Sequence, residues 1–481
     1  MRACRLLLIA VLLTAAFGAA LLARVPAPAE AWSRFRGSNG SGVSDTTGIP
    51  TEFGVARNVI WKTALPQGHS SPVLGAGRIF LTAFEGDTLL TLCLDRESGR
   101  ILWRREAPRA RALYLDRRNG PASPTPVTDG RAVYVFFQDF GLIAYEVNGH
   151  ERWRVPLGPF TSSYGMAASP IVVDGKVILV CDQSVGSFII AVGADDGRMV
   201  WRIERPEAKS GYSTPVLYRP KEGATELIVP GSFFLTAYAV QTGQKLWWVR
   251  GLSFQMKATP VMGQGTIYIH GPSSGDLEDS YNRAVPIFDQ LAPKHDLDND
   301  GRFSPIEIPD ELAKRLFKLL DLNADGFLDA DEWAVYSTAR ASQGGLWAFR
   351  LGGRGDMTES NVLWHYGKAI PELPSGLLYR NVLYTLNDRG IMTSFDPASG
   401  KVIAQRRIQG AIDNYFASPV AADGKIFLVS ESGKVPVLKS DGSLEPLAVN
   451  DLEEMCYATP AIADGRIYVR TSKALYCFGR R

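Results

Sequence analysis

The stretch Pro124-Thr125-Pro126-Val127, followed by the turn Asp129-Gly130-Arg131 and the run Val133-Tyr134-Val135, contains the pattern that decides the fold. It belongs to a unit that opens with a small residue, a Ser or Thr, and a Pro, and continues as two short β-rich runs. The opening triplet occurs seven times, at Ser70-Ser71-Pro72, Ala122-Ser123-Pro124, Ala168-Ser169-Pro170, Ser213-Thr214-Pro215, Ala258-Thr259-Pro260, Ala417-Ser418-Pro419 and Ala458-Thr459-Pro460. Such a repeat indicates one supersecondary unit copied along the chain.

The spacing of the triplet prolines predicts eight units. The steps are 52, 46, 45 and 45 residues, then 159, then 41. One four-stranded propeller blade takes about 40–50 residues. The long step therefore holds one blade without the triplet, starting near Pro374-Ser375-Gly376-Leu377, and an insertion. We predict an all-β, eight-bladed β-propeller of four-stranded antiparallel blades, with a small α-helical insertion in one blade.

A second signature closes many of the units. Trp stands four residues after Gly in the pairs Gly99 and Trp103, Gly149 and Trp153, Gly197 and Trp201, and Gly243 and Trp247. Glycine suits a turn with positive φ between the third and fourth strands. A Trp on the fourth strand can fill the wedge between neighbouring blades. We interpret these Trp residues as packing residues.

These motifs resemble the repeat of the quinoprotein-type (PQQ-like) eight-bladed propellers. The family pattern A-x-D-x-x-[ST]-G-x-x-x-W is seen as Cys93–Trp103 and Ala237–Trp247, with a weaker copy from Ser394 that ends in Ala404. The opening Trp32–Gly40 is similar to the start of exported bacterial proteins of this type. The resemblance covers residues 32–481 apart from the insertion, and the blade pattern resembles the outer-membrane-assembly propeller scaffold.

The two ends of the repeat predict how the ring closes. Asn58-Val59-Ile60-Trp61-Lys62 has the pattern of a fourth strand with no blade before it. The last unit, Ala458 to Phe478, has no fourth strand after it. Pairing the first strand with the last blade would complete eight blades and remove two open strand edges.

Residues 1–31 are predicted to be a signal peptide. A basic start, an apolar run from Leu6 to Ala23 and Ala29-Glu30-Ala31 fit export with cleavage before Trp32. An uncleaved membrane anchor is the alternative, since about 18 apolar residues nearly span a bilayer. We expect a periplasmic or secreted protein that does not insert into the membrane unless this segment is retained.

Charge and cysteine content exclude some partners. Cleavage would remove Arg2, Arg5, Arg24 and Glu30 and leave 49 basic and 49 acidic residues. No basic block indicates nucleic acid, and Arg117-Arg118 fits a solvated loop.

The remaining cysteines are Cys93, Cys181, Cys456 and Cys477. A disulfide between Cys456 and Cys477 is possible in an exported protein, but sequence cannot pair them.

The insertion, residues 271–343, divides the propeller into residues 32–270 and 344–481 and carries two acidic loops of one design. Each matches the EF-hand loop, with oxygen ligands at positions 1, 3, 5, 9 and 12, a backbone carbonyl at position 7, and Gly at position 6. The predicted calcium ligands are Asp296, Asp298, Asp300, Arg302, Ser304 and Glu307 in the first loop, and Asp321, Asn323, Asp325, Phe327, Asp329 and Glu332 in the second.

Between the acidic loops, a helix is expected to start at Pro309, with Asp310 and Glu311 in its first turn. We expect a structural calcium site with a Kd on the order of 10⁻⁴–10⁻³ M, as in extracellular modules.

Strand alternation predicts which loops share a face. Connections from second to third strands and from fourth to first strands lie at the same end of the blades. The insertion should therefore overhang the face where Tyr164, Tyr212, Met256, Lys257, Tyr415, Phe416 and Tyr457 approach the channel mouth. Lys257 is expected to be the one cation near the axis. These side chains could pack against each other, or could bind a protein or a small ligand.

Two functions follow from this interpretation. The first is an exported, non-catalytic binding scaffold, expected to be monomeric, with calcium in its insertion. The second is a quinone-dependent dehydrogenase acting on alcohols or sugars. The resemblance implies that such enzymes hold PQQ over the channel near an adjacent Cys-Cys pair and a calcium ion. The chain has no adjacent Cys pair and its calcium motifs lie in the insertion, so PQQ is possible but not favoured, and no catalytic residue is assigned.

Overall fold

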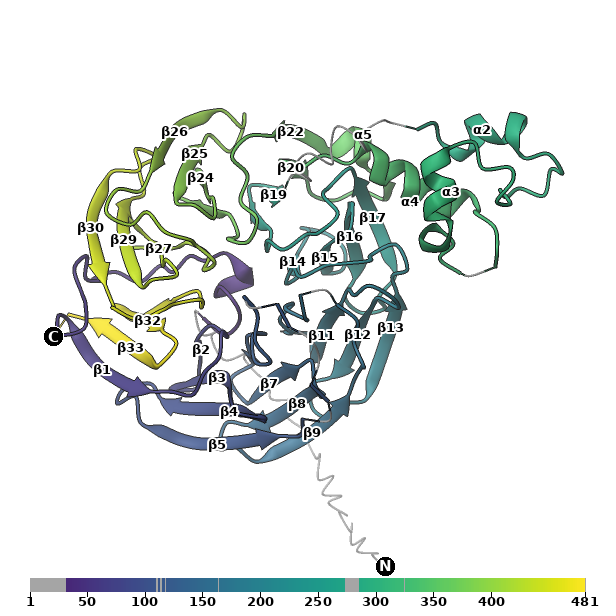
Figure 1. Cartoon of the computed structure of the whole chain (residues 1–481). Coiled ribbons are helices and arrows are strands. Elements are labelled where there is room, and N and C mark those ends of the chain that lie inside the picture. Colours follow the sequence, from purple (N-terminus) through teal and green to yellow (C-terminus); the bar gives the residue numbers. More distant parts are fainter. Residues whose placement is uncertain are drawn as a thin grey trace, which may run out of the picture.

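The computed structural model describes residues 32–480 except residues 110, 113, 114, 117, 163, 273–284 and 324. Eight antiparallel sheets are arranged around a central axis as the blades of a propeller (Figure 1). This confirms the predicted all-β, eight-bladed fold. The predicted signal peptide, residues 1–31, lies outside the described residues.

The first four blades follow the chain in order, each with its first strand innermost. Blade one is β2 (Val73–Gly75), β3 (Arg78–Glu85), β4 (Thr88–Asp95) and β5 (Ile101–Ala107). Blade two is β6 (Val127–Thr128), β7 (Ala132–Phe137), β8 (Gly141–Glu146) and β9 (Glu151–Pro156). Blade three is β10 (Ile171–Val173), β11 (Lys176–Cys181), β12 (Phe188–Gly193) and β13 (Met199–Glu204). Blade four is β14 (Val216–Tyr218), β15 (Glu226–Gly231), β16 (Phe234–Ala239) and β17 (Lys245–Arg250).

The other four blades include the interrupted one and the closing one. Blade five is β18 (Val261–Gly263), β19 (Thr266–Gly271), β20 (Gly345–Arg350) and β22 (Val362–Tyr366), and it sends β21 (Gly355–Asp356) to the outer edge of blade four. Blade six is β23 (Leu377–Tyr379), β24 (Val382–Leu386), β25 (Ile391–Phe395) and β26 (Val402–Arg407). Blade seven is β27 (Val420–Ala422), β28 (Lys425–Phe427), β29 (Lys434–Lys439) and β30 (Pro446–Asp451). Blade eight is β31 (Ala461–Ala463), β32 (Arg466–Arg470), β33 (Ala474–Gly479) and β1 (Val59–Ala64).

The ring is closed by the first strand of the chain, as predicted. β1 pairs antiparallel with β33 in a register that places Trp61 opposite Cys477 and Ala64 opposite Ala474. The N-terminal strand therefore completes the C-terminal blade, and both outer edges that an incomplete ring would expose are paired.

A belt of hydroxyl groups joins the blades around the axis. In seven of eight steps, the backbone N–H of one residue donates to the side-chain oxygen of the next blade's residue at 2.9–3.1 Å. At the remaining step the Ser213 hydroxyl donates to the carbonyl of Ala258 at 2.7 Å. We call these eight residues the hydroxyl belt: Ser71, Thr125, Ser169, Thr214, Thr259, Ser375, Ser418 and Thr459.

The belt corrects the register of the triplet in blade two. Thr125 is the belt member there, followed by Pro126, whereas Ser123 of the expected triplet Ala122-Ser123-Pro124 stands two residues earlier. In blade six, Ser375 keeps the belt position although Gly376 replaces the proline. The repeat depends on the hydroxyl, because the hydroxyl makes the inter-blade bond and the proline donates nothing.

Tryptophans join neighbouring blades at the outer wall, as predicted from their packing role. The indole N–H of Trp103 donates to the Val147 carbonyl of the next blade at 2.9 Å, and Trp153 donates to Ala194 at 2.9 Å. Trp61, Trp201 and Trp364 make the same bond at three other joints. Each indole thus satisfies its polar atom while it buries a large apolar ring.

Three joints lack this bond and use other contacts. Between blades four and five, the Trp247 indole donates to Glu226 of its own blade at 2.8 Å, and its ring lies in one buried cluster with Ile267 and Phe349 of blade five. Between blades six and seven, the Ser394 hydroxyl donates to the Gly442 carbonyl at 2.7 Å. Between blades seven and eight, the N-terminal segment lies along the joint: the Asn450 side chain accepts from the N–H of Phe53 at 2.8 Å, and the Phe53 ring lies 4.7 Å from that of Phe478. The chain before β1 therefore fills the gap that a missing Trp would leave.

The segment Trp32–Gly42 crosses the centre of the ring and carries the short helix η1 (Ser38–Gly40) (Figure 1). Its carbonyl oxygens at Trp32 and Ser33 accept from Leu74 and Thr128 on the innermost strands. The guanidinium of Arg36 donates to Gly376, and the Asn39 amide bonds Leu217 in both directions at 2.8 Å. We call this segment the N-terminal plug.

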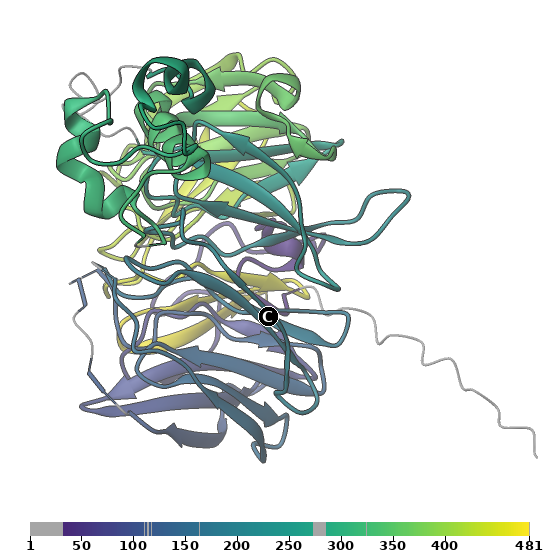
Figure 2. The same cartoon turned by 90° about the vertical axis from the view of Figure 1, so that its right-hand side faces the viewer.

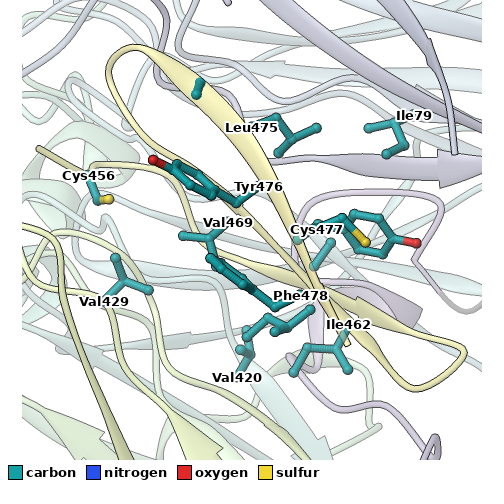
Figure 3. Close-up of a cluster of buried hydrophobic side chains, with 14 of the residues drawn as sticks. Ile79, Val420, Val429, Cys456, Ile462, Val469, Leu475, Tyr476, Cys477 and Phe478 are labelled. Atoms are coloured by element: carbon teal, nitrogen blue, oxygen red, sulfur yellow. The ribbon is translucent and has the colours of Figure 1, made fainter. Parts of the chain in front are cut away.

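The four described cysteines are buried free thiols, so the possible disulfide is absent from the structure. Figure 3 shows Cys456 and Cys477 as separate side chains in the core around β33. Cys477 belongs to β33 and Cys456 to the connection before β31, and burial raises the pKa of both thiols to about 12. They behave as small apolar core residues.

The segment between β19 and β20 forms a helical lobe outside the ring (Figures 1 and 2). Its helices are α2 (Phe288–His295), α3 (Glu311–Leu320) and α4 (Ala330–Ala341), packed around Phe303, Trp333 and Tyr336. α3 begins at Glu311, two residues later than expected, because the Asp310 side chain caps it by accepting from Leu312 and Ala313. In blade five, α5 (Thr358–Asn361) precedes β22. Among the described residues, none of the helices has the length and apolarity needed to cross a membrane.

Candidate functional site

A pocket of about 210 Å³ lies on the axis of the ring. All eight residues of the hydroxyl belt line it, and each is only 2–3% exposed. Phe35 of the N-terminal plug also contributes to the wall. The channel is therefore a pocket with a polar belt and a plug, with aromatic residues of the connecting loops around it.

Five of the seven residues predicted to approach the channel mouth line this pocket: Tyr164, Tyr212, Lys257, Phe416 and Tyr457. The rings of Tyr164 and Tyr212 meet edge to face with centroids 5.8 Å apart. Across the pocket wall, Tyr457 stacks on Phe416 at 5.8 Å and on His69 at 4.5 Å. Two aromatic groups thus come from connections far apart in the sequence.

Tyr415 is placed differently from the expectation. Its side chain is completely buried in the core of blades six and seven, and its hydroxyl donates to the Ala411 carbonyl at 2.7 Å. Phe416, the next residue, lines the pocket instead. Met256 is also buried, in the core of blades four and five. The error has a simple cause, because adjacent residues of an extended connection point to opposite sides.

The expectation that Lys257 is the one cation near the axis is wrong. Arg118 also lines the pocket, where Asp116 accepts its Nε–H at 2.7 Å, so it is not the solvated loop residue that was expected. Its guanidinium carbon lies 5.3 Å from the Tyr164 ring centre, and the Lys257 ammonium lies 5.4 Å from the same ring. Tyr164 therefore contacts two cations, each of which has its own carboxylate partner.

Buried groups hold the mouth in place. Lys257 pairs with Glu372, and Asp388 accepts from the backbone N–H groups of Glu372 and Leu373 at 2.8 and 3.0 Å. Burial raises the pKa of Asp388. Burial, helped by the charge of Arg470, lowers the pKa of His69 to about 4, so its ring is neutral at pH 7.

The first acidic loop brings Asp296, Asp298 and Glu307 together, with one oxygen of each within 4.8 Å of the others. Glu307 is 6% exposed. Hydrogen bonds from the hydroxyl and N–H of Ser304 lower the pKa of Glu307. Asp300 lies outside this group and accepts from Arg302 at 3.0 Å instead.

The second acidic loop brings Asp321, Asp325 and Glu332 together within the same distance. Asp329 and Glu332 form a capping box at the start of α4, which fixes both side chains. Gly301 and Gly326 have φ values of 80° and 87°, as the turn at the sixth loop position requires. Asn323, Phe327 and Ser304 occupy the expected loop positions in the sequence; among these, Asn323 Oδ1 accepts from Asp325 N–H at 2.8 Å.

The two acidic loops are paired with each other and with the mouth. Phe303 and Leu328 exchange backbone hydrogen bonds of 2.8 and 2.9 Å. At the base of the lobe, the N–H of Gln343 donates to the carbonyl of Gly251, in the connection that leads to Lys257. Burial lowers the pKa of Lys209, while Glu332 and Glu207 act in the opposite direction. The charge of Glu332 in the second acidic loop thus acts on the connection that leads to Tyr212.

Sequence reasoning missed the plug residues and the role of the belt. Arg34 and Arg36 are buried beside the belt: Arg34 donates to the carbonyl of Pro215 and Arg36 to those of Gly376 and Pro419. Each of those carbonyls belongs to the residue that follows a belt member. Two arginines two residues apart, before any strand and followed by glycines, were the only available signal.

A family model described as outer membrane protein assembly factor BamB matches residues 56–157, 91–277 and 335–480. The chain belongs to the BamB family. The match covers blades before and after the helical lobe and leaves out residues 278–334, which hold both acidic loops. The lobe is therefore an addition to the part that the BamB family model describes. No curated protein matches the chain.

Solved structures share the fold of this BamB-family chain at low identity. BamB from Moraxella catarrhalis aligns with a TM-score of 0.54 and 13% identity over 88% of this chain and 97% of its own. The quinohemoprotein alcohol dehydrogenases from Comamonas testosteroni and Pseudomonas putida HK5 align with TM-scores of 0.58 and 0.56 and 13% identity. They cover 93% and 94% of this chain, and 80% of each enzyme is covered. At these identities the likeness shows the fold alone.

The residues of this BamB-family pocket do not fit the PQQ site that the resemblance implies. Such a site needs an adjacent Cys pair and a metal beside the cofactor, yet the described cysteines are buried in the blades and their connections. Among the described residues, both acidic groups able to hold a metal lie in the helical lobe. Asp116, the one carboxylate lining the pocket, is held by Arg118. We therefore derive no redox step at this pocket.

Proposed function

We propose that the protein is an exported, non-catalytic scaffold that binds a partner protein or a small ligand at the channel mouth. The observation that supports it is the axial pocket, with a belt of hydroxyls below two aromatic groups. Concave sites lined by aromatic side chains and a few placed polar groups are favoured binding sites. The BamB-family description as an assembly factor of the outer membrane agrees with a scaffold in the periplasm.

A catalytic role is not favoured because the lining residues do not form an acid–base or nucleophilic pair. His69 is buried, neutral at pH 7 and stacked on Tyr457. Asp116 accepts from Arg118, and Lys257 pairs with Glu372. The belt hydroxyls serve the joints between blades. His69 Nδ1 has no partner among the described residues, but burial holds the pKa of His69 near 4 and makes it a weak base. These side chains are therefore better suited to position a ligand than to move a proton.

We also propose that both acidic loops bind calcium, with weak structural sites. Carboxylates at ligand spacing and the glycine at the sixth position are what a hard cation with six to eight oxygen ligands needs. Calcium would lock α2, α3 and α4 together, because the loops are joined through Phe303 and Leu328. The hydrogen bond from Gln343 to Gly251 would then carry that stiffness to the mouth loops.

Capture of partners from envelope fractions tests the scaffold. The matched proteins are the wild type, the mouth variant Phe416→Ala with Tyr457→Ala, and the control Val402→Ser on the exposed outer strand β26. We expect one set of partners with the wild type and the control, and its loss with the mouth variant. Chelator should weaken capture by the wild type. Equal capture by all three proteins would contradict the proposed mouth site.

A further inference from the structure

The hydroxyl belt has hydrogen-bond donors that the fold does not use. Each hydroxyl of a Ser or Thr can accept and can donate one hydrogen bond. Seven belt hydroxyls accept a backbone N–H from the neighbouring blade. None of the eight donates to another residue in the described structure, although all line the pocket and are 2–3% exposed. The pocket therefore has a ring of buried O–H groups to which the described residues offer no acceptor.

Positive charge lies close to the same belt without a carboxylate partner. Arg34 and Arg36 are buried, and desolvation lowers the pKa of each to about 9. Arg34 Nε, Arg36 Nε and Arg36 Nη1 have no hydrogen-bond partner among the described residues. Arg470 is likewise buried and donates to Ser70, next to belt residue Ser71, while its Nε is unpartnered.

Another buried arginine in this chain shows the ordinary arrangement. Arg205, 2% exposed in its side chain, donates to both carboxylate oxygens of Asp182 at 2.9 and 3.0 Å. A buried charge is costly unless it is paired and hydrogen-bonded. The cations near the belt thus differ from Arg205, because their hydrogen-bond partners among the described residues are carbonyl and hydroxyl oxygens and include no carboxylate.

The charged groups at the mouth do not neutralise the positive charge of the buried arginines. Arg118 is paired with Asp116 and Lys257 with Glu372, so the two pairs cancel. His69 is neutral at pH 7 because burial keeps its pKa near 4. The groups near the axis that have no acceptor or carboxylate partner among the described residues are therefore hydrogen-bond donors and positive charges.

We infer that the axial pocket binds a small organic anion, with its carboxylate or phosphate group against the hydroxyl belt and its apolar body between Tyr164 and Tyr457. The inference rests on the proposed function only in that the pocket is a binding site. A volume of about 210 Å³ is below the range of pockets that take drug-sized ligands, which favours a compact molecule. The aromatic rings can pack against a flat apolar body.

Calorimetry with simple probes tests the anion site on the full-length protein. The probes are benzoate, its neutral isostere benzamide, phenyl phosphate and inorganic phosphate. Because a hydrogen bond to a charged group contributes about 1.5–3 kcal/mol, we expect benzoate to bind at least about tenfold more tightly than benzamide. Inorganic phosphate should compete with benzoate. Comparing the affinity of phenyl phosphate with that of benzoate shows whether a phosphate or a carboxylate group fits better. Equal binding of benzoate and benzamide, or no binding of any anion, would overturn the inference.

Variants of the belt locate the anion. Ser375→Ala and Thr459→Val each remove one donor, and Thr242→Val, in an exposed turn of blade four, is the matched control. We expect each belt variant to bind benzoate at least about threefold more weakly than the wild type. The control should bind benzoate as tightly as the wild type. Unchanged binding in both folded belt variants would contradict the site. Partner capture at the mouth does not depend on these anions, so its failure and the failure of the anion site are separate results.

Discussion

The backbone N–H of Thr459 donates to the hydroxyl of Ser71 at 3.1 Å, across 388 residues of sequence. This bond joins the last belt member to the first, at the centre of the ring. Within blade eight, β1 pairs with β33 nearer the outer wall. The two closures hold both ends of the chain and leave the insertion between β19 and β20 as the one helical lobe among the described residues.

The tryptophan joints should carry much of the stability of the ring. Trp153 is 8% exposed, packs on Tyr134 and donates to Ala194. Trp153→Ala should lower the free energy of unfolding by about 3–5 kcal/mol, because it leaves a large cavity and an unpaired carbonyl. Urea unfolding measures the change. Trp248→Ala, at a half-buried Trp of β17, is the control and should cost clearly less; equal costs would contradict the joint role.

Calcium should raise the melting temperature, since a ligand that binds only the folded state stabilises it. At millimolar calcium and a Kd on the order of 10⁻⁴–10⁻³ M, the gain is on the order of 1 kcal/mol per site. Glu307→Gln with Glu332→Gln should abolish the shift, measured by differential scanning calorimetry. Asp331→Asn, an exposed acid beside Glu332, should keep it. A shift that survives in the double variant would place calcium elsewhere.

Acid should destabilise the protein through His270. Its ring is buried, and burial lowers its pKa to about 4, against 6.5 when unfolded. The unfolded chain therefore binds one more proton between these values, and stability falls as the pH drops from 6.5 towards 4. The contribution is about 1.4 kcal/mol per pH unit within that window.

The His270→Gln variant isolates this effect. Its unfolding free energy, measured by urea at several pH values, should depend on pH with a slope smaller by about one proton than that of the wild type. His150→Gln, at an exposed turn, should keep the wild-type slope. Identical slopes for all three proteins would mean that His270 takes up a proton in the folded state.

Two tyrosines that were both predicted for the mouth, Tyr415 and Tyr457, should separate stability from binding. Tyr415→Ala removes a completely buried ring and should cost about 3–5 kcal/mol of unfolding free energy. Tyr457→Ala, at a half-buried pocket residue, should cost less and weaken partner capture. Thermal unfolding and capture on the same samples give both readings. Strong capture loss in a stable Tyr415→Phe variant would contradict this division.

The ring could be predicted because its signals recur with the blade. A hydroxyl before a proline and a Trp after a turn are each required by a contact to the next blade, so spacing alone gives eight blades. The acidic loops could be recognised for a similar reason, because metal ligation dictates residue type at fixed positions.

Other features depend on tertiary contacts that a sequence pattern does not contain. Tyr415 and Phe416 differ only in which side of an extended connection they occupy. Arg34 and Arg36 are charged residues of the kind expected on an exposed segment. They are nevertheless buried, because carbonyl groups at the centre of the ring accept hydrogen bonds from their guanidinium groups. Phe53 packs against Phe478 at the joint between blades seven and eight, where no Trp occupies the space between the blades.

Site-directed photocrosslinking tests the mouth as a binding site most directly. A photoreactive phenylalanine replaces Phe416 at the pocket or Val402 on the outer strand β26, in the full chain within its envelope. The account predicts a defined adduct from position 416, less of it after chelation, and none of the same size from position 402. An adduct from position 402 with none from position 416 would contradict the account.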